Sequence, residues 1–444
     1  MAGRTRREFG RDLALASGAL ATAPSWLAAQ DSPQPRKLVV GVMGVHGRGA
    51  ALADIFAGQP DAEVGWVCEV DDRYAPECVE SVESIQGTSP RVTKDVREVL
   101  RQPDVDALVI AAPDHWHAPA SILAVAAGKH VYVEKPCGHN PREGELLIEA
   151  QKRYGRIIHM GNQRRSWPNV IRCIEALRGG IIGRVYFARG WYANNRESIG
   201  VGKEAPVPDA LDYELWQGPA PRTPYRDNIH PYDWHWFRHW GTGEALNNGS
   251  HELDVMRWGL GVDYPTRVVA SGGRYHYQDD WEFPDTMSLS IEFEGGCAMS
   301  WEGRSCNNYP HEESGRGVIF HGEEGTVVQV EHGYTAYAND DDQTVIEELT
   351  GEPSGTDPTN PVSPDAALDE VHVRNFLDGI QKGVPTSSPI EEGHKSVLLG
   401  HLGNIAWRTG RVLRVDPASG HILGDPEAMK LWGREYEPGW EPEV

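Results

Sequence analysis

The chain has 444 residues, which is too many for one ordinary hydrophobic core, so its length predicts two domains. Hydrophobic residues make up 39% and charged residues 24%, as in a soluble globular protein, and no apolar run is long enough to predict a membrane-spanning helix. The net charge of −23 disfavours binding to nucleic acid and to anionic membranes and favours a neutral or small-molecule substrate.

The first 29 residues have the features of an export signal. Arg6 and Arg7 are followed by Phe9 and by an Ala- and Leu-rich run that ends in small residues. This pattern resembles a twin-arginine signal, so we expect residues 1–29 to be a signal peptide and the protein to be exported or periplasmic. The twin-arginine route carries folded proteins. The polar, proline-broken residues 30–37 are expected to form a linker.

Between residues 38 and 161, strand-like and helix-like segments alternate. The expected strands are LVVGVMG, AEVGWVCEV, DALVIAAP, HVYVEKP and RIIHMGNQ, and the expected helices between them are GRGAALADIFAG, DDRYAPECVESVESI, PASILAVAAG and REGELLIEAQKRYG. Apolar strands that alternate with helices indicate a parallel sheet with helices on both faces. Residues 38–161 are therefore expected to be an α/β Rossmann domain.

After Asn162 the pattern changes to that of an α+β domain. Period-two alternation predicts a largely antiparallel, open sheet with strands at GRVYFARGWYA, RVVASGGRYHY, TMSLSIEF, CAMSWEGRS, GVIFHGEEG and TVVQVEH. Helices are expected at VIRCIEALRGG, ALDEVHVRNFLDGIQKG and EEGHKSVLLGHLGNIAWRTG. We expect this domain to span residues 162–417 and to include a long loop rich in proline and tryptophan from 194 to 233. Residues 418–444 are expected to be a mostly irregular tail.

The first strand leads into GVMGVHGRG, the position at which a dinucleotide-binding turn belongs. The N-terminus of the next helix would offer free N–H groups to a pyrophosphate. The predicted cofactor contacts in this turn are Gly44, His46, Gly47, Arg48 and Gly49. A strict G-x-G-x-x-G pattern would have glycine at position 46, so Gly47 takes that part or the turn is shifted.

The second and third strands end in further candidate cofactor contacts. Glu69 follows Gly49 by about 20 residues, the spacing at which a carboxylate binds the adenosine ribose, which favours NAD over NADP. Asp71 could share this role, and Arg73 leaves NADP open. Pro113 and His117 follow the third strand, where the nicotinamide half is expected. His115 and His117 could also form a metal pair, but no partner ligand is evident and we expect no metal.

The fourth strand ends in Glu134, Lys135 and Pro136. Ligands of open parallel sheets bind at the carboxyl edge, so Lys135 and Glu134 are expected at the cofactor site. Pro136 would turn the chain out of the strand, through a trans or a cis bond. An ordinary ion pair at the end of a strand is the alternative interpretation.

These motifs together resemble the Gfo/Idh/MocA family of oxidoreductases. The resemblance covers about Leu38 to Pro417 and is carried by the nucleotide turn, PDHWH, EKP, GNQRR and GEALNNGSHELDVMRWGLG. It implies that His251 faces the nicotinamide. The family has an aspartate one turn before this histidine, whereas this chain has Asn247, which can bind a sugar hydroxyl but carries no charge.

The resemblance implies hydride transfer between a nicotinamide and a secondary hydroxyl of a sugar or glycoside. We predict that His251 is the general base, that Lys135 stabilises the developing oxyanion, and that Asn247 belongs to the same site. The alternatives are a redox-neutral, NAD-dependent glycoside hydrolase on the same scaffold and a binding protein without catalysis. An exported enzyme would have to retain its cofactor, and the family also implies a homo-oligomer.

Aromatic residues ahead of the predicted active-site helix are typical of carbohydrate binding, because a sugar ring has an apolar face and polar edges. Packing between the domains is an equally good interpretation of this cluster. The predicted sugar contacts here are Trp234, His235, Trp236, Arg238 and His239, with Trp240 nearby, and further candidates are Arg165, Tyr192 and Asn195. The six cysteines show no C-x-x-C pair and are expected to be free thiols.

Overall fold

The computed structural model describes residues 36–330, 333–350 and 367–444. The predicted signal peptide, most of the predicted linker and the PSGTDPTNPVSPD loop lie outside the described residues. Residues 37–444 form a single unit that contains both predicted domains.

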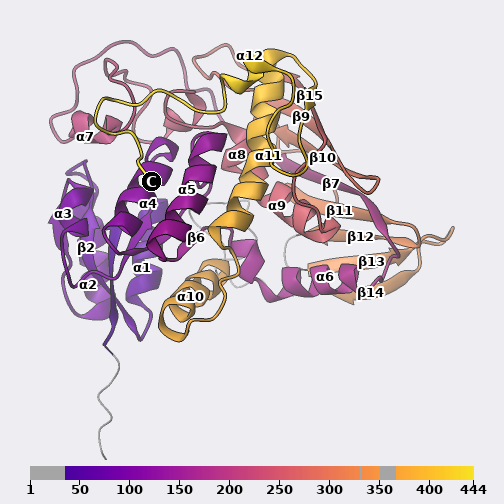
Figure 1. The fold of residues 1–444 in the computed structure, drawn as a ribbon, viewed down its shortest axis with the longest axis horizontal. Coiled ribbons are helices and arrows are strands. Elements are labelled where there is room, and N and C mark those ends of the chain that lie inside the picture. The colour runs from indigo at the N-terminus through magenta and orange to yellow at the C-terminus, as the bar shows by residue number, and fades with distance from the viewer. Residues whose placement is uncertain (1–35, 331–332, 351–366) are drawn as a thin grey trace, which may run out of the picture. The chain divides into compact units, whose positions relative to one another are not determined.

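The first sheet has six parallel strands in the order β3-β2-β1-β4-β5-β6. They are β1 (Leu38–Met43), β2 (Ala62–Cys68), β3 (Arg91–Thr93), β4 (Ala107–Ile110), β5 (His130–Val133) and β6 (Ile158–Met160). The connecting helices are α1 (Arg48–Ala57), α2 (Ala75–Gln86), α3 (Val96–Leu100), α4 (Asp114–Ala126) and α5 (Pro141–Tyr154) (Figure 1). The order reverses between β1 and β4, and the crevice at the carboxyl ends of these strands is where such sheets bind ligands.

The second sheet has nine strands in the order β14-β13-β12-β11-β7-β10-β9-β8-β15. The strands are β7 (Val185–Ala193), β8 (Arg267–Gly273), β9 (Thr286–Phe293), β10 (Cys297–Arg304), β11 (Arg316–Gly322), β12 (Gly325–Val330), β13 (Gly333–Ala338), β14 (Val345–Leu349) and β15 (Leu413–Arg414). Only the pairing of β10 with β7 is parallel. The predicted fold class, a Rossmann domain followed by a largely antiparallel α+β domain, is confirmed.

Helices cover one face of the second sheet and join it to the first domain. α6 (Pro168–Arg178), α9 (Gly249–Leu260) and α11 (Ile390–Thr409) pack on this face, and α11 also packs against α5. α10 (Ala367–Lys382) returns to the first domain, where its Phe376 lies against Phe56 of α1 (Figure 1). The strands alternate accordingly: on β9, Leu289 and Ile291 are buried, whereas Ser288 and Ser290 are exposed.

The proline- and tryptophan-rich segment after β7 lies against the first domain. It contains α7 (Tyr213–Gln217), the 3₁₀ turn η2 (Asp233–Trp236) and α8 (Glu244–Asn247). Its aromatic side chains form a cluster of their own that includes Tyr213, Trp216, Tyr225, Trp234 and Trp240. Leu211 bridges to Asp71, and His230 donates from Nε2 to the Asp71 carboxylate at 2.9 Å. This segment therefore connects the end of β2 to the second domain.

The C-terminal tail, which includes α12 (Pro426–Met429), ends beside α4 (Figure 1). Pro119 within α4 has no N–H to donate to the carbonyl of His115 four residues earlier. Arg434 of the tail donates to that carbonyl at 2.6 Å and also pairs with Glu143 at 2.8 Å. The ring of Trp440 meets that of Trp116 edge to face at 5.1 Å. The tail thus has few regular elements but specific contacts.

Several elements differ from the sequence-based expectation. α4 begins at Asp114, so DHWH forms its first turn, whereas the sequence pattern predicted a start near Pro119. The short β3, α3 and β15 and the outer strands β13 and β14 were not predicted. Segments of two to six residues carry too little periodicity to identify an element.

Candidate active site

The turn between β1 and α1 is built around three glycines. Gly44 and Gly47 have positive φ values of 79° and 68°, which favour glycine. A β-carbon at Gly49 would lie 1.7 Å from the carbonyl oxygen of Gly44, so the helix approaches the strand closely only because this residue is glycine. A β-carbon at Gly47 would meet no atom within 4 Å, because the turn faces open space. The free N–H groups of α1 therefore remain accessible to a phosphate.

The remaining residues of this turn and the end of β2 complete the site for the adenosine half of a dinucleotide. Glu69 accepts hydrogen bonds from the backbone N–H groups of Val45 at 2.8 Å and Asp71 at 2.9 Å, and burial raises the pKa of its carboxyl group. His46 occupies the middle position of the motif, with its ring 4.2 Å from that of Tyr74. Arg48 pairs with Glu134 and Asp369, so its guanidinium holds α10 against the first domain.

The Asp71 and Arg73 side chains lie outside this site. Asp71 is fully buried and accepts hydrogen bonds from Arg73 and His230, and Arg73 pairs with Asp71 in return. Neither residue lines the cavity described below. The suggestions that Asp71 shares the ribose or that Arg73 accommodates a 2′-phosphate are therefore corrected, because each side chain is occupied by the other.

The ends of β4 and β5 bring Pro113, His117 and Lys135 to the same edge of the sheet. The ring nitrogens of His117 lie 2.7 Å from the carbonyl oxygen of Ala112 and 2.6 Å from that of Pro136, so this side chain ties the two strand ends together. The peptide bond between Lys135 and Pro136 is cis. Lys135 donates from Nζ to the backbone carbonyl of Asn247 and, at 3.1 Å, to its side-chain Oδ1.

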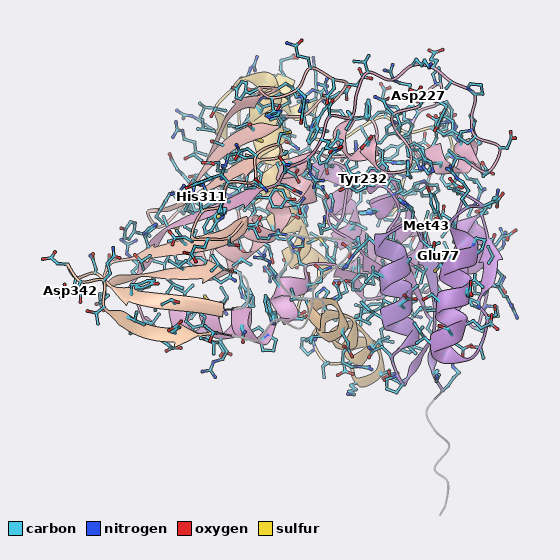
Figure 2. All side chains as sticks on the ribbon, turned by 180° about the vertical axis from the view of Figure 1, so that it is seen from behind. Met43, Glu77, Asp227, Tyr232, His311 and Asp342 are labelled. Carbon is cyan, nitrogen blue, oxygen red and sulfur yellow. The ribbon has the colours of Figure 1, made fainter. Side chains whose placement is uncertain are left out.

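One cavity of about 560 Å³ connects these residues to the second domain. Its nucleotide end is lined by Gly44, His46, Gly47, Arg48, Glu69 and Pro113. Its reaction end is lined by His117, Glu134, Lys135, Arg164, Tyr192, Asn247, His251 and Arg316. Trp234 and His235 of η2 line it as well, as do Met43 and Tyr232, which are labelled in Figure 2. Lys135 and His251 thus come from different domains and share a cavity.

His251 lies in the first turn of α9 and is buried. Burial lowers its pKa well below the ordinary value of 6.5, and the nearby cations Arg316, Lys135 and Arg164 lower it further. Its Nδ1 atom has no hydrogen-bond partner within the described residues. Burial also lowers the pKa of the Lys135 ammonium, against the opposing effect of Glu134. An uncharged imidazole therefore faces the same cavity as an ammonium group.

Four of the predicted sugar contacts lie outside the cavity. Arg165 pairs with Asp254 at 2.8 Å and with Glu392 at 3.3 Å. Trp236 stacks on Trp281 with ring centroids 3.8 Å apart. The other two are Arg238, which contacts Glu282, and His239, which contacts the Pro221 carbonyl. Two further candidates also lie elsewhere: Trp240 belongs to the aromatic cluster, and Asn195 forms a bridge to Cys306. Packing rather than substrate binding explains these residues.

The cavity also has lining residues that the sequence did not predict. They include Gln163, Arg164, Arg196, Trp216, His230, Asn248, Arg316 and Asp369. The GNQRR motif is a signal for Arg164, but its pattern does not distinguish Arg164 from Arg165, the predicted sugar contact. Gly49 is buried beneath the turn and does not line the cavity.

Among the described residues, no group of three His, Cys, Asp or Glu side chains has an arrangement that could hold a metal ion. No helix in the same part of the chain is long and apolar enough to cross a membrane. The six cysteines are free.

A Rossmann sheet with a glycine turn, joined by one cavity to a second antiparallel sheet, defines a two-domain nucleotide-binding protein. Two family models match the chain: the NAD-binding Rossmann fold of the Gfo/Idh/MocA oxidoreductase family at residues 36–162, and the C-terminal alpha/beta domain of the same family at residues 218–415. The chain belongs to the Gfo/Idh/MocA oxidoreductase family, and its cofactor is NAD.

Similar proteins include two curated relatives and a solved structure. A glycosyl hydrolase family 109 protein of Saccharopolyspora erythraea is 30% identical over 36% of this chain and 36% of its own length. An inositol 2-dehydrogenase of Rubrobacter xylanophilus is 29% identical over 40% of this chain and 50% of its own length. The matches therefore span half or less of these relatives. A levoglucosan dehydrogenase in complex with NADH and levoglucosan shares the fold, with a TM-score of 0.65, 20% identity and coverage of 85% of this chain and 99% of that one.

Proposed function

We propose that this protein is an NAD-dependent oxidoreductase that transfers hydride to or from a secondary hydroxyl of a sugar or glycoside. The observation that carries this proposal is the shared cavity, in which Lys135 of the first domain and His251 of the second lie beyond the nucleotide turn. The curated relatives support the substrate class, since they include an inositol 2-dehydrogenase and a levoglucosan dehydrogenase of Pseudarthrobacter phenanthrenivorans, the latter 37% identical over 22% of this chain.

The residues present fit NAD. The open space above Gly47 and the free N–H groups of α1 suit the pyrophosphate, and the Glu69 carboxylate suits the adenosine ribose. When bound, NAD supplies the hydride acceptor or donor, and the protein supplies position and electrostatic field. Glu69 would also repel a 2′-phosphate, which favours NAD over NADP.

In this proposal His251 and Lys135 handle the proton of the reacting hydroxyl. His251 is uncharged at neutral pH because its pKa is lowered, so its imidazole can accept that proton. Lys135 donates a hydrogen bond to the same oxygen and stabilises the negative charge that develops on it. Asn247 accepts from the ammonium through both its backbone and its side-chain oxygen, so Asn247 aims Lys135 rather than exchanging a proton itself.

A redox-neutral glycosidase is the second candidate, and the match to a glycosyl hydrolase family 109 protein favours it. Such an enzyme would oxidise the sugar, eliminate the glycosidic substituent, add water and return the hydride. The same lysine and histidine would serve both reactions. The difference lies in whether the reduced cofactor is consumed within the same turnover.

We also propose that the protein is exported by the twin-arginine route and keeps its cofactor bound. The support is the sequence of residues 1–29 together with the covering of the nucleotide end by His230 of the long loop and by Asp369 of α10.

A homo-oligomer formed through the exposed face of the second sheet is a further proposal, supported by the strand alternation in which Ser288 and Ser290 are exposed. Light scattering of the purified protein tests it.

The test is an absorbance spectrum of the full chain, purified from the compartment to which it is delivered and then mixed with sugars and glycosides. Persistent reduced-nicotinamide absorbance, without added NAD, supports an oxidoreductase with retained cofactor. Release of the aglycone without net reduction supports the glycosidase. Full activity that requires added NAD and releases NADH to solution would contradict cofactor retention, and the absence of both signals would contradict the proposed function.

A further inference from the structure

The reaction end of the cavity contains a buried guanidinium with an unpartnered nitrogen among the described residues. Arg164 lies in the 3₁₀ turn η1 (Gln163–Ser166), is only 5% exposed and lines the cavity. Its Nη1 atom is 3.9 Å from Oε1 of Glu252 and has no hydrogen-bond partner within the described residues. Burial, followed by the neighbouring Arg316, lowers the pKa of Arg164 to about 10. A cation in this state is incompletely compensated by the protein.

A second arginine uses the same carboxylate. Arg316 on β11, 2% exposed, donates to Glu252 Oε1 from Nε at 2.9 Å and from Nη2 at 2.7 Å. Its guanidinium lies 5.3 Å from the ring centre of Tyr192, which also lines the cavity. Glu252 on α9 is fully buried behind this wall and does not line the cavity. Two guanidinium groups therefore share one carboxylate.

Among the described residues, the other cations at this end have carboxylate partners of their own. Arg48 pairs with Glu134 and Asp369, and Glu134 is also the principal carboxylate acting on Lys135, so these two cations and two carboxylates offset one another. Arg196 pairs with Glu244 at 2.8 Å.

Asp114 acts on Lys135 as well and accepts a hydrogen bond from the Thr242 hydroxyl, and Asp254 pairs with Arg165. Among the described residues, Arg164 and Arg316 thus have one carboxylate, that of Glu252, between them.

Asn247 adds no negative charge at this end of the cavity. A carboxylate at this position would offset one of the surrounding cations. The amide of Asn247 accepts from Lys135 at 3.1 Å without carrying charge.

We propose that the sugar substrate carries a carboxylate, which Arg164 and Arg316 bind at the reaction end of the cavity. This inference rests on the proposed function and specifies its substrate class as acidic sugars or their glycosides. Arginine binds carboxylates with two parallel hydrogen bonds, and the Nη1 atom of Arg164 has no hydrogen-bond partner within the described residues.

The experiment compares glucuronate with glucose, galacturonate with galactose, and glucose 6-phosphate with all four, using the NAD-loaded full chain and reduced-nicotinamide absorbance. The variants are Arg164→Gln, Arg164→Lys and, as a control, Arg184→Gln, whose arginine pairs with Glu323 at the surface. We expect kcat/KM for the better uronate to exceed that for its neutral counterpart by about 10- to 100-fold, the range of a charge-assisted hydrogen bond. Arg164→Gln should reduce this ratio to near one, mainly through KM, and Arg164→Lys should retain part of it.

Calorimetric titration of glucuronate and galacturonate into the NAD-loaded protein separates this inference from the proposed function. Binding of either uronate that is lost in Arg164→Gln but kept in Arg184→Gln supports the acidic-sugar site even where no sugar reduces NAD, a result that would contradict only the proposed function. Equal use of neutral and acidic sugars, preference for glucose 6-phosphate, or an unchanged ratio in Arg164→Gln would overturn the inference. A loss of NAD affinity in Arg164→Gln with an unchanged ratio would also overturn it, by assigning the guanidinium to the cofactor.

Discussion

At the nucleotide end of the cavity, the glycine turn and Glu69 lie close together in sequence. At the reaction end, the lining side chains come from elements that are far apart in sequence. Gly44, Gly47 and Gly49 lie within one turn, and Glu69 ends the next strand. Lys135 follows β5, Asn247 ends α8 and Arg316 begins β11, so these residues meet only in the folded protein. The nucleotide end therefore depends on local backbone geometry, and the reaction end depends on how the two domains pack.

This difference suggests that the two ends can be damaged separately. A change that removes a charge at the reaction end should affect turnover and leave cofactor affinity intact. A change that distorts the glycine turn should do the opposite. The three predictions below test this separation, beginning with the largest expected effect.

Lys135→Met is expected to lower kcat by about 10²- to 10³-fold, the range for loss of one donor to a developing oxyanion. Methionine fills the volume of the lysine stem and removes the ammonium. NAD affinity should change little, because Lys135 donates to Asn247 rather than to the glycine turn. Steady-state kinetics with a sugar that the wild-type protein oxidises, together with titration of NAD, checks both parts.

The control for this variant is Lys152→Ala on the exposed face of α5, which should leave turnover unchanged. Turnover of Lys135→Met within a factor of about three of wild type would contradict the assigned role of Lys135. An equal loss of NAD affinity and turnover would contradict the separation of the two ends.

Gly49→Ala is expected to weaken NAD binding by about 10- to 100-fold, because overpacking by one methyl group typically costs about 1–3 kcal/mol. The new β-carbon would lie 1.7 Å from the Gly44 carbonyl oxygen, so the turn must open. At saturating NAD, kcat should remain close to wild type. Fluorescence titration with NAD and kinetics at high NAD concentration measure the two quantities.

Gly87→Ala is the matched control for backbone strain. Gly87 has φ of 79° at the end of α2, but its β-carbon would meet no atom within 4 Å. This variant should lower thermal stability without changing NAD affinity. If Gly49→Ala binds NAD as tightly as Gly87→Ala does, the close approach of strand and helix is not what shapes the nucleotide site.

The same contrast between local and distant contacts separates what the sequence predicted from what it did not predict. Alternating strands and helices, the glycine turn and the spacing to Glu69 are local patterns, and they predicted the Rossmann domain and its cofactor. The long, strongly periodic strands β7, β9 and β10 likewise predicted the second sheet. The short strand β15 and the tail contact of Trp440 with Trp116 depend on tertiary packing, which no local pattern encodes.

At the reaction end, the sequence identified the motif but not the orientation of its side chains. Arg164 and Arg165 are adjacent in the 3₁₀ turn η1, where successive side chains point about 120° apart. One therefore faces the cavity, and the other pairs with Asp254 on its far side. The position of Asp254, 89 residues further along the chain, determines which of the two neighbouring arginines pairs with a carboxylate and which faces the cavity.

Asp71→Asn is the variant with the smallest expected effect. It changes a contact between the first domain and the long loop. Burial raises the pKa of Asp71, but hydrogen bonds from Arg73 and His230 outweigh it and lower the pKa from 3.8 to about 2. His230 belongs to the long loop that covers the nucleotide end, so the carboxylate holds this cover in place. We expect the variant to lose about 1.5–3 kcal/mol of unfolding free energy, the range for hydrogen bonds to a charged group, and to release bound NAD up to about tenfold faster.

The pH dependence gives this contact a signature of its own. Because the folded pKa lies below the unfolded value, the stabilisation by Asp71 is fully present above about pH 4 and is lost as the pH falls toward 2. The difference in unfolding free energy between wild type and Asp71→Asn should therefore be constant from neutral pH to about pH 4 and shrink below it. A difference that instead begins to change as the pH falls below about 6.5 would assign the effect to protonation of His230, whose pKa burial lowers from 6.5. NAD release at an unchanged rate would mean that the cover is held by the aromatic cluster rather than by this carboxylate.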